Sequence, residues 1–258
     1  MNATKTLIYD GSFNGFLTAV FIGFEQKLPY AEIQRQSHLQ RGLFTDNETI
    51  FTNLEKAQRV WNGVRNKSNT AIKNIYFAYQ SEQRNIETLL YLYVQKLMGS
   101  QSNRVSDFSD DCILKINQLA YKVGREKHRM EAFVRFQLTK DEVYFAHIEP
   151  DYDVLPLISK HFRNRYADQQ WIIYDLKRKY GLYYDLNGVE IISLDLKDVH
   201  TNSLQKSTAF TDAEHEYQNL WQNYFQSTTI KSRINTKLHT QHVPKRYWKY
   251  LSEKKEAV

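Results

Sequence analysis

The sequence has little of what cofactor-bearing and exported proteins need. Its 258 residues contain one cysteine, Cys112, whereas a disulfide framework, a zinc ribbon or an iron–sulfur cluster needs several thiols. The first residues, MNATKTLIYDGSF, have no long apolar run after a basic stretch, which argues against a signal peptide. No segment offers roughly 18 uninterrupted apolar residues, so we predict no membrane span. We therefore expect a cytoplasmic protein without a cofactor.

The signatures of several known catalytic and metal sites are also missing. His239 and His242 lie three residues apart, but no further ligands of the right type accompany them, so we predict no metal site. The loop that contains Asp10 lacks the spacing of a phosphate-binding glycine loop. No nucleophile elbow of the Gly-x-Ser-x-Gly type occurs.

What the chain does have is a strongly basic end. Hydrophobic residues make up 41% and aromatic residues 14%, which predicts a packed fold. Residues 1–225 balance 27 basic against 27 acidic side chains, whereas residues 226–258 carry eight Lys or Arg against two Glu. The whole net charge of +6 thus lies in the last eighth of the chain. This pattern predicts contact with a polyanion; a solvated terminal helix is the alternative.

Apolar spacing predicts a helical N-terminal half. A short strand at Thr6–Tyr9 precedes a helix over residues 15–26, and a capping box at Thr52–Glu55 opens a second helix. Two more helices are predicted at Ile86–Met98 and from Ser109 to about Met130.

The middle of the chain changes to a period of two, which is typical of strands. The hairpin signal Asn187-Gly188 joins two of them, and a helix is expected from Pro156 to Tyr166. We therefore predict an α+β fold with a central antiparallel sheet, a helix on one face of that sheet, and a basic helical C-terminus. The predicted strands are 133–138, 143–148, 171–176, 182–186 and 189–194.

Residues 200–210 are the most plausible linker. We expect an α+β core domain over residues 1–200 and a helical basic segment over 201–258 that packs on the core. Within that segment a capping box at Thr211–Glu214 predicts one helix, and Arg246–Lys254 predicts the last one.

An ordered set of strings along the chain resembles a bacterial protein family. The strings are YDGSFNGFL (9–17), KVGREKHRMEAFVRF (122–136), HIEPDYDVLPLISKHFRNRY (147–166), WIIYD (171–175) and RINTKLHTQHVPKRYWKYL (233–251). The set is similar to the uncharacterised bacterial family described as probable DNA metabolism proteins. The resemblance implies a DNA-repair setting, with a radical SAM protein of DNA modification or repair as a partner. Related versions are fused to a uracil-DNA glycosylase domain, and this chain ends shortly after the last string.

The resemblance transfers no catalytic residue, so candidate sites come from spacing. Arg125, His128 and Arg129 share one face of a helix, and Glu126 stands beside them. Two guanidinium groups with an imidazole form a reasonable phosphate cradle. The alternative is a solvated charged face in which Glu and Arg pair locally.

Two further groups are weaker candidates. His161 and Arg165 lie one helical turn apart, and a histidine near an acid is a possible general base. Asp10, with Ser12 and Asn14, follows the first strand, where loops often carry function. Structural roles are the alternative for both groups: His161 against the core and Asp10 in an ordinary turn.

The basic end is the strongest candidate, because single-stranded nucleic acid is commonly bound by cations interleaved with aromatic rings. Trp248 could instead dock the last helix on the body. The candidate catalytic residues are thus Glu126, His128, His161 and Asp10, and the candidate nucleic-acid contacts are Arg125, Arg129, Arg165, Arg233, Lys237, Lys245, Arg246, Tyr247 and Trp248.

Three functions fit these features. The first is a DNA-binding accessory to a radical SAM enzyme, which would hold the iron–sulfur cluster that one cysteine cannot. The second is an enzyme that acts on DNA directly, such as a glycosylase or a nuclease. The third is RNA processing, because basic charge alone does not separate RNA from DNA. Whether the chain is itself an enzyme stays open at this point.

Overall fold

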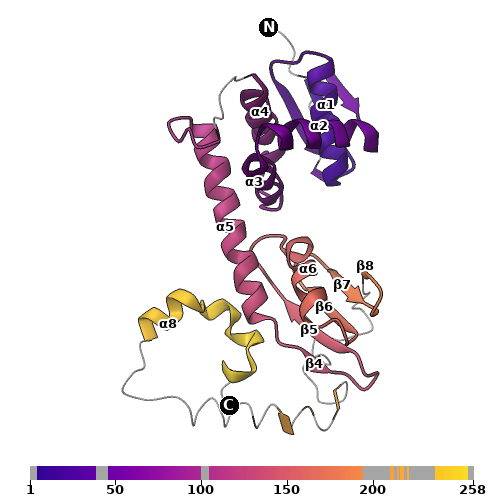
Figure 1. Cartoon of the computed structure of the whole chain (residues 1–258), viewed down its shortest axis with the longest axis vertical. Helices are drawn as coiled ribbons and strands as arrows, with labels where there is room; N and C mark the ends of the chain where they lie inside the picture. Colours follow the sequence, from indigo (N-terminus) through magenta and orange to yellow (C-terminus); the bar gives the residue numbers. More distant parts are fainter. Residues whose placement is uncertain are drawn as a thin grey trace. The chain divides into compact units, whose positions relative to one another are not determined.

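The computed structural model describes residues 5–38, 46–99, 105–193, 210–211, 214, 216–217, 220 and 236–254 (Figure 1). The chain divides into two compact units, Met1–Gly124 and Arg125–Val258, and the division falls within helix α5 (Asp111–Phe133). The sequence interpretation places its boundary at residue 200 instead. In the structure the basic C-terminal segment belongs to the same unit as residues 125–200.

A three-stranded parallel sheet forms the centre of the first unit. Its strands are β1 (Lys5–Tyr9), β2 (Ala31–Arg35) and β3 (Asp46–Thr49), in the order β2-β1-β3. Helix α1 (Phe13–Glu25) connects β1 to β2, and a helical crossover of this kind permits parallel pairing. The sequence predicts only the central strand, because β2 and β3 are short and largely polar.

Helices supply the rest of the first unit and most of its core, as the N-terminal half of the sequence predicts. Leu7 of β1, Phe16 of α1, Leu90 of α4 and Ile113 of α5 have no exposed surface. Besides α1 and the first part of α5, the helices are α2 (Leu54–Lys67), α3 (Asn69–Tyr79), α4 (Ile86–Gly99) and the short 3-10 helix η1 (Gln36–His38).

The start of α2 differs from the predicted capping box. Asn53, and not Thr52, caps the helix, and its side-chain oxygen accepts a hydrogen bond from the Lys56 amide at 3.0 Å. The Thr52 hydroxyl instead donates to Asp10 at 2.7 Å. Thr52 therefore connects the segment after β3 to the loop after β1. Both follow the carboxyl ends of their strands.

A five-stranded sheet forms the centre of the second unit. The strands follow chain order: β4 (Gln137–Leu138), β5 (Tyr144–Ile148), β6 (Trp171–Asp175), β7 (Tyr180–Tyr184) and β8 (Val189–Ile192). Helix α6 (Leu155–Arg165) connects β5 to β6 and packs against the sheet (Figure 1). The predicted mixed α+β class is confirmed.

The predicted antiparallel sheet is wrong for one pair of strands. β5 and β6 pair in parallel, from Tyr144 opposite Trp171 to Ile148 opposite Asp175. The reason is the α6 crossover, which returns the chain to the same end of the sheet. The predicted antiparallel partners β4–β5 and β7–β8 do pair as expected. However, β4 has only two residues, because α5 continues as far as Phe133 and residues 134–136 have no regular structure.

The β7–β8 hairpin closes by a different turn from the predicted one. Four residues, Asp185–Gly188, separate the strands, and the left-handed residue is Leu186 with φ of 80°. The Asp185 side chain accepts hydrogen bonds from the amides of Asn187 and Gly188, each at 2.8 Å. An Asp side chain thus organises the loop that we expected Asn187-Gly188 to form alone.

The C-terminal part of the second unit consists of short helices. Helix α8 (Thr236–His242) precedes the 3-10 helices η3 (Lys245–Tyr250) and η4 (Ser252–Lys254). The predicted last α-helix is therefore two 3-10 segments. The predicted linker up to residue 209, Arg233 and most of the helix predicted from Thr211 lie outside the described residues.

Among the helices of the described residues, none is long and apolar enough to cross a membrane. The 23-residue α5 illustrates this, because Lys115, Lys122 and Arg125 interrupt its apolar positions.

Two helical glycines should respond oppositely to a methyl group. A Cβ on Gly15 would overlap Asp10 and lie 2.8 Å from Thr52 Oγ1, whereas one on Gly63 would meet only Met98, at 3.7 Å. We expect Gly15→Ala to lower the free energy of unfolding by about 1–3 kcal/mol. Gly63→Ala should raise it by about 0.5–1 kcal/mol, because glycine is a poor helix former. Urea denaturation of both variants measures this difference, and equal effects would contradict it.

Candidate nucleic-acid interface

A buried carboxylate organises the second unit. Glu126, on α5, is 1% exposed and accepts hydrogen bonds from α5 itself and from two other segments. The Asp151 amide donates to it at 2.8 Å, and the Tyr247 hydroxyl donates to the same oxygen. Arg129 and Arg246 reach its other oxygen, each at 3.4 Å. Because an unpaired buried charge is very costly, these partners are what permits Glu126 to lie inside.

Tyr247 is the residue that anchors the C-terminal segment. Its side chain is 1% exposed, and its ring lies 5.5 Å from the ring of Phe133. Burial, and next the hydrogen bond to Glu126, raise the pKa of the Tyr247 phenol far above its usual value, so it remains a donor at every physiological pH. The Arg246 guanidinium lies over the same ring, 4.5 Å from its centre.

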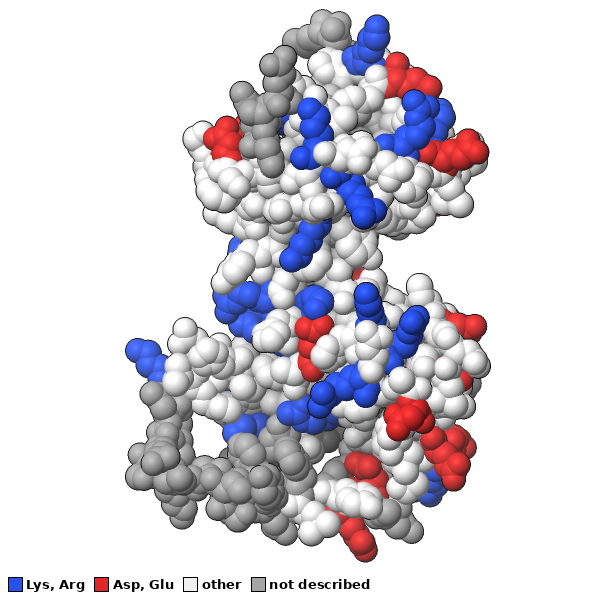
Figure 2. Space-filling model, in the orientation of Figure 1, with Lys and Arg blue, Asp and Glu red and all other residues white. Residues whose placement is uncertain are grey.

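Basic side chains from separate segments gather around Asp151, which follows β5. Arg246 Nη2 lies 2.6 Å from the Asp151 carboxylate. The Asp151 carbonyl accepts from Lys177 Nζ at 3.2 Å and from Arg178 Nη2 at 3.3 Å, and both residues belong to the β6–β7 turn. Arg178 is held in addition by the buried Asp175, at 2.8 Å. On the face shown in Figure 2, Lys and Arg side chains stand close together over α5 and the neighbouring part of this unit.

A second carboxylate fixes the end of η3. Glu149 accepts from both Lys249 and the Tyr250 hydroxyl, and the ring of His147 lies edge-on to Tyr250 at 5.2 Å. Burial alone would raise the pKa of Glu149, but the bonds from Lys249 and Tyr250 hold that pKa below its usual value. The C-terminal segment is thus attached at two carboxylates.

The structure also brings the two candidate histidines to one carboxylate. His128 Nδ1 lies 4.0 Å, and His161 Nδ1 3.7 Å, from the oxygens of Glu131. The His128 side chain is 87% exposed and the His161 side chain 38%, so this cluster lies at the surface. Lys127 also pairs with Glu131.

Asp10 belongs to the first unit, and its carboxylate stabilises the loop after β1. Its oxygens accept from the Ser12 amide at 2.8 Å, the Ser12 hydroxyl at 2.7 Å and the Thr52 hydroxyl at 2.7 Å. Although partial burial opposes it, these bonds hold the pKa of Asp10 below its usual value. A carboxylate that is occupied in this way is a loop anchor and a weak base.

The predicted nucleic-acid contacts fall into two groups. Arg125, Arg165, Lys237 and Lys245 are exposed. By contrast, Arg129 and Arg246 pair with Glu126, and Tyr247 is buried, so its ring has no surface on which a base could stack.

Trp248 has a local role. Its indole N–H donates to the Val243 carbonyl at 3.0 Å. The amino groups of Lys245 and Lys254 lie 5.9 Å and 5.5 Å from the centre of its ring. The half-buried ring therefore gathers two cations of the C-terminal segment.

Comparison with protein families gives one match. The model of a domain of unknown function, DUF4130, matches residues 84–253, about two thirds of the chain. The chain belongs to the DUF4130 family. The DUF4130 match includes Glu126, Asp151 and Tyr247, and it begins just before α4. A comparison with curated proteins finds no match.

Sequence spacing did not find the central role of Glu126. The sequence suggests only that Glu126 stands beside the basic residues of its helix, whereas the structure gives its carboxylate four donors. The partner Tyr247 lies 121 residues away, so no local pattern connects the two.

Removal of one hydroxyl tests this arrangement. Tyr247→Phe leaves the buried Glu126 with one donor fewer, and we expect a loss of about 1–3 kcal/mol in the free energy of unfolding. Tyr250→Phe is the matched control, because water can replace its bond to Glu149, whose side chain is 36% exposed. Hydrogen exchange of residues 236–254 should rise clearly in Tyr247→Phe and only slightly in Tyr250→Phe. The reverse order would contradict the assignment of Tyr247 as the anchor.

The attachment at Glu149 should depend on pH. Because its pKa is lowered by folding, Glu149 contributes stability above its ordinary pKa of 4.5, and this contribution disappears as the pH falls through the folded value. We expect Glu149→Gln to be less stable than the unmodified protein at pH 7, and the two to converge in acid. Urea unfolding at a series of pH values measures the difference, and a constant difference would refute this role.

Proposed function

We propose that the chain is a nucleic-acid-binding protein of DNA metabolism. In this proposal the second unit binds phosphates through the basic C-terminal segment. The observation that carries the proposal is the anchoring of that segment by Tyr247 on Glu126. Lys245 precedes Arg246 and Tyr247 in η3, so anchoring at this point holds its backbone on a fixed support from which its charge can act on phosphate.

The geometry favours a structural role over catalysis for two of the four candidate catalytic residues. Glu126 and Asp10 are both occupied by structural hydrogen bonds. Neither carboxylate is therefore available to take a proton from a substrate. Phosphate binding needs only exposed cations on a rigid support, and Lys237 and Lys245 meet this requirement.

One observation favours the enzyme alternative. His161 Nδ1 faces Glu131, and a carboxylate that orients an imidazole is the usual support of a general base. A glycosylase or nuclease would use His161 in that role, with Arg165 or Arg125 on phosphate. Loss of a DNA-directed activity in His161→Gln, with binding retained, is the result that would favour this alternative.

The partner is part of the proposal. The resemblance to DNA metabolism proteins suggests a cytoplasmic accessory that presents DNA to a radical SAM enzyme, which would hold the iron–sulfur cluster. Cys112 suits a structural role better than a redox role, because burial raises the pKa of its thiol. Co-purification with a radical SAM protein, with no iron in the chain on its own, is the expected result. RNA is the alternative polyanion, and comparison of DNA with RNA oligonucleotides separates the two.

The salt dependence of binding tests the interface. Affinity falls with salt at a slope of about −0.7 to −0.9 per neutralised phosphate. We expect the double variant Lys237→Ala/Lys245→Ala to weaken binding for all sequences and to flatten this slope by about one to two units. Fluorescence anisotropy with single- and double-stranded oligonucleotides measures both quantities.

Lys140→Ala is the control for charge alone, because this lysine is exposed in the β4–β5 turn of the same unit. It should leave the slope unchanged. Equal effects of the double variant and Lys140→Ala, or no salt-dependent binding to any oligonucleotide, would refute the proposed interface.

A further inference from the structure

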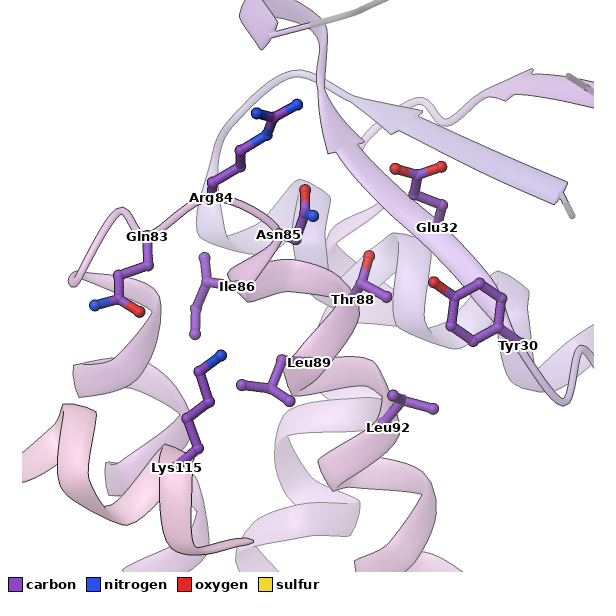
Figure 3. Close-up of a pocket in the computed structure, with 10 residues that line it drawn as sticks. All are labelled: Tyr30, Glu32, Gln83, Arg84, Asn85, Ile86, Thr88, Leu89, Leu92 and Lys115. Carbon is purple, nitrogen blue, oxygen red and sulfur yellow. The ribbon is translucent and has the colours of Figure 1, made fainter. Parts of the chain in front are cut away.

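The first unit contains a cavity that the phosphate-binding surface does not use. It has a volume of about 280 Å³ and lies where β2 and the start of α4 meet (Figure 3). A second cavity of about 460 Å³ adjoins it. Both are lined by Glu32, Gln83, Arg84 and Asn85. Their combined space is within the usual range for a small-molecule site.

The wall of the cavity between its polar ends is apolar. Ile86, Leu89 and Leu92 come from successive turns of α4, and Tyr30 stands at the rim with 49% of its surface exposed. An exposed aromatic ring beside an aliphatic floor suits a flat, weakly polar body.

The end of the cavity at β2 carries the acceptor oxygens of Glu32, Asn85 and Thr88, and the guanidinium of Arg84 lies on the same side (Figure 3). In Figure 3 the polar ends of Glu32, Asn85 and Thr88 face the same space. Neighbouring bonds hold two of them: Glu32 accepts from Gln34 at 2.7 Å, and the Thr88 hydroxyl accepts from the Ile33 amide at 3.1 Å. This end can therefore receive the amino or imino donors of a ligand.

The opposite end offers a cation. Lys115, on α5, places its amino group beside Ile86 and Leu89, with Gln83 nearby (Figure 3). The loop that carries Gln83 is conformationally constrained, because Glu82 and Asn85 have positive φ angles of 51° and 62°. Non-glycine residues rarely adopt such angles, and the residues that do so are concentrated at functional sites.

We propose that this cavity binds one nucleotide, with the base between Tyr30 and the apolar wall and the phosphate at Lys115. A ligand that uses both ends carries donors toward Glu32, an anion toward Lys115 and a flat body between them. A nucleotide has this layout, whereas the ammonium and carboxylate of a free amino acid sit on one carbon and cannot occupy opposite ends. The inference rests on the proposed function, since it gives the DNA-binding protein a site for a single unstacked nucleotide.

Binding of the four deoxynucleoside 5′-monophosphates to the full chain tests this site by calorimetry. We expect binding that Lys115→Ala weakens roughly tenfold, as the loss of one charged hydrogen bond does. Lys122→Ala is the matched control, because this lysine is exposed on the same helix and does not line the cavity. Inorganic phosphate and L-leucine are the comparison ligands.

Three results would overturn the site. They are no monophosphate binding at millimolar concentration, equal effects of Lys115→Ala and Lys122→Ala, and binding of L-leucine in place of the monophosphates. Oligonucleotide binding that depends on Lys237 and Lys245 but without monophosphate binding would leave the proposed function standing alone. Monophosphate binding that depends on Lys115, without salt-dependent oligonucleotide binding, would support the cavity and refute the interface.

Discussion

The second unit depends on the burial of one carboxylate. Glu126 is 1% exposed, so its charge must be compensated inside the protein, and the donors that do so come from α5, the segment after β5 and the C-terminal segment. Removal of any donor exposes the cost of the buried charge. The position of the basic segment is thus set in part by the buried contacts of Arg246 and Tyr247 with Glu126. The Glu126 carboxylate therefore matters both for the stability of the second unit and for the proposed binding surface.

The cations of the C-terminal segment fall into two groups, those in ion pairs with the rest of the unit and those exposed to solvent. Arg246 is committed to Glu126 and Asp151, and Lys249 to Glu149, so these charges hold the segment in place. Lys237 and Lys245 are exposed, and in the proposed function they contact phosphate. Net charge therefore overstates the number of groups that can contact phosphate. Because some cations attach the segment to the second unit, the exposed lysines are carried on a fixed support.

Much of the fold follows from local sequence. The apolar period predicts α4 and most of α5, and alternation with turn residues predicts the β7–β8 hairpin. Local sequence does not predict the pairing of strands and side chains that are far apart in the chain. β2 and β3 are mostly polar and become strands only because β1 lies between them, and β5 pairs with β6 in parallel because α6 reverses the chain between them. The roles of Tyr247 and Glu126 could not be predicted from local sequence for the same reason, because each residue's partner lies on another segment.

In the proposed function the position of the basic segment, and not its charge alone, makes the interface. The most direct measurement is the oligonucleotide affinity of Tyr247→Ala at fixed salt, because this variant removes the anchor and changes no charge. We expect the affinity to fall at least severalfold and the hydrogen exchange of residues 236–254 to become faster. An unchanged affinity, with the segment released, would contradict this expectation and would show that the lysines bind as a flexible polycation.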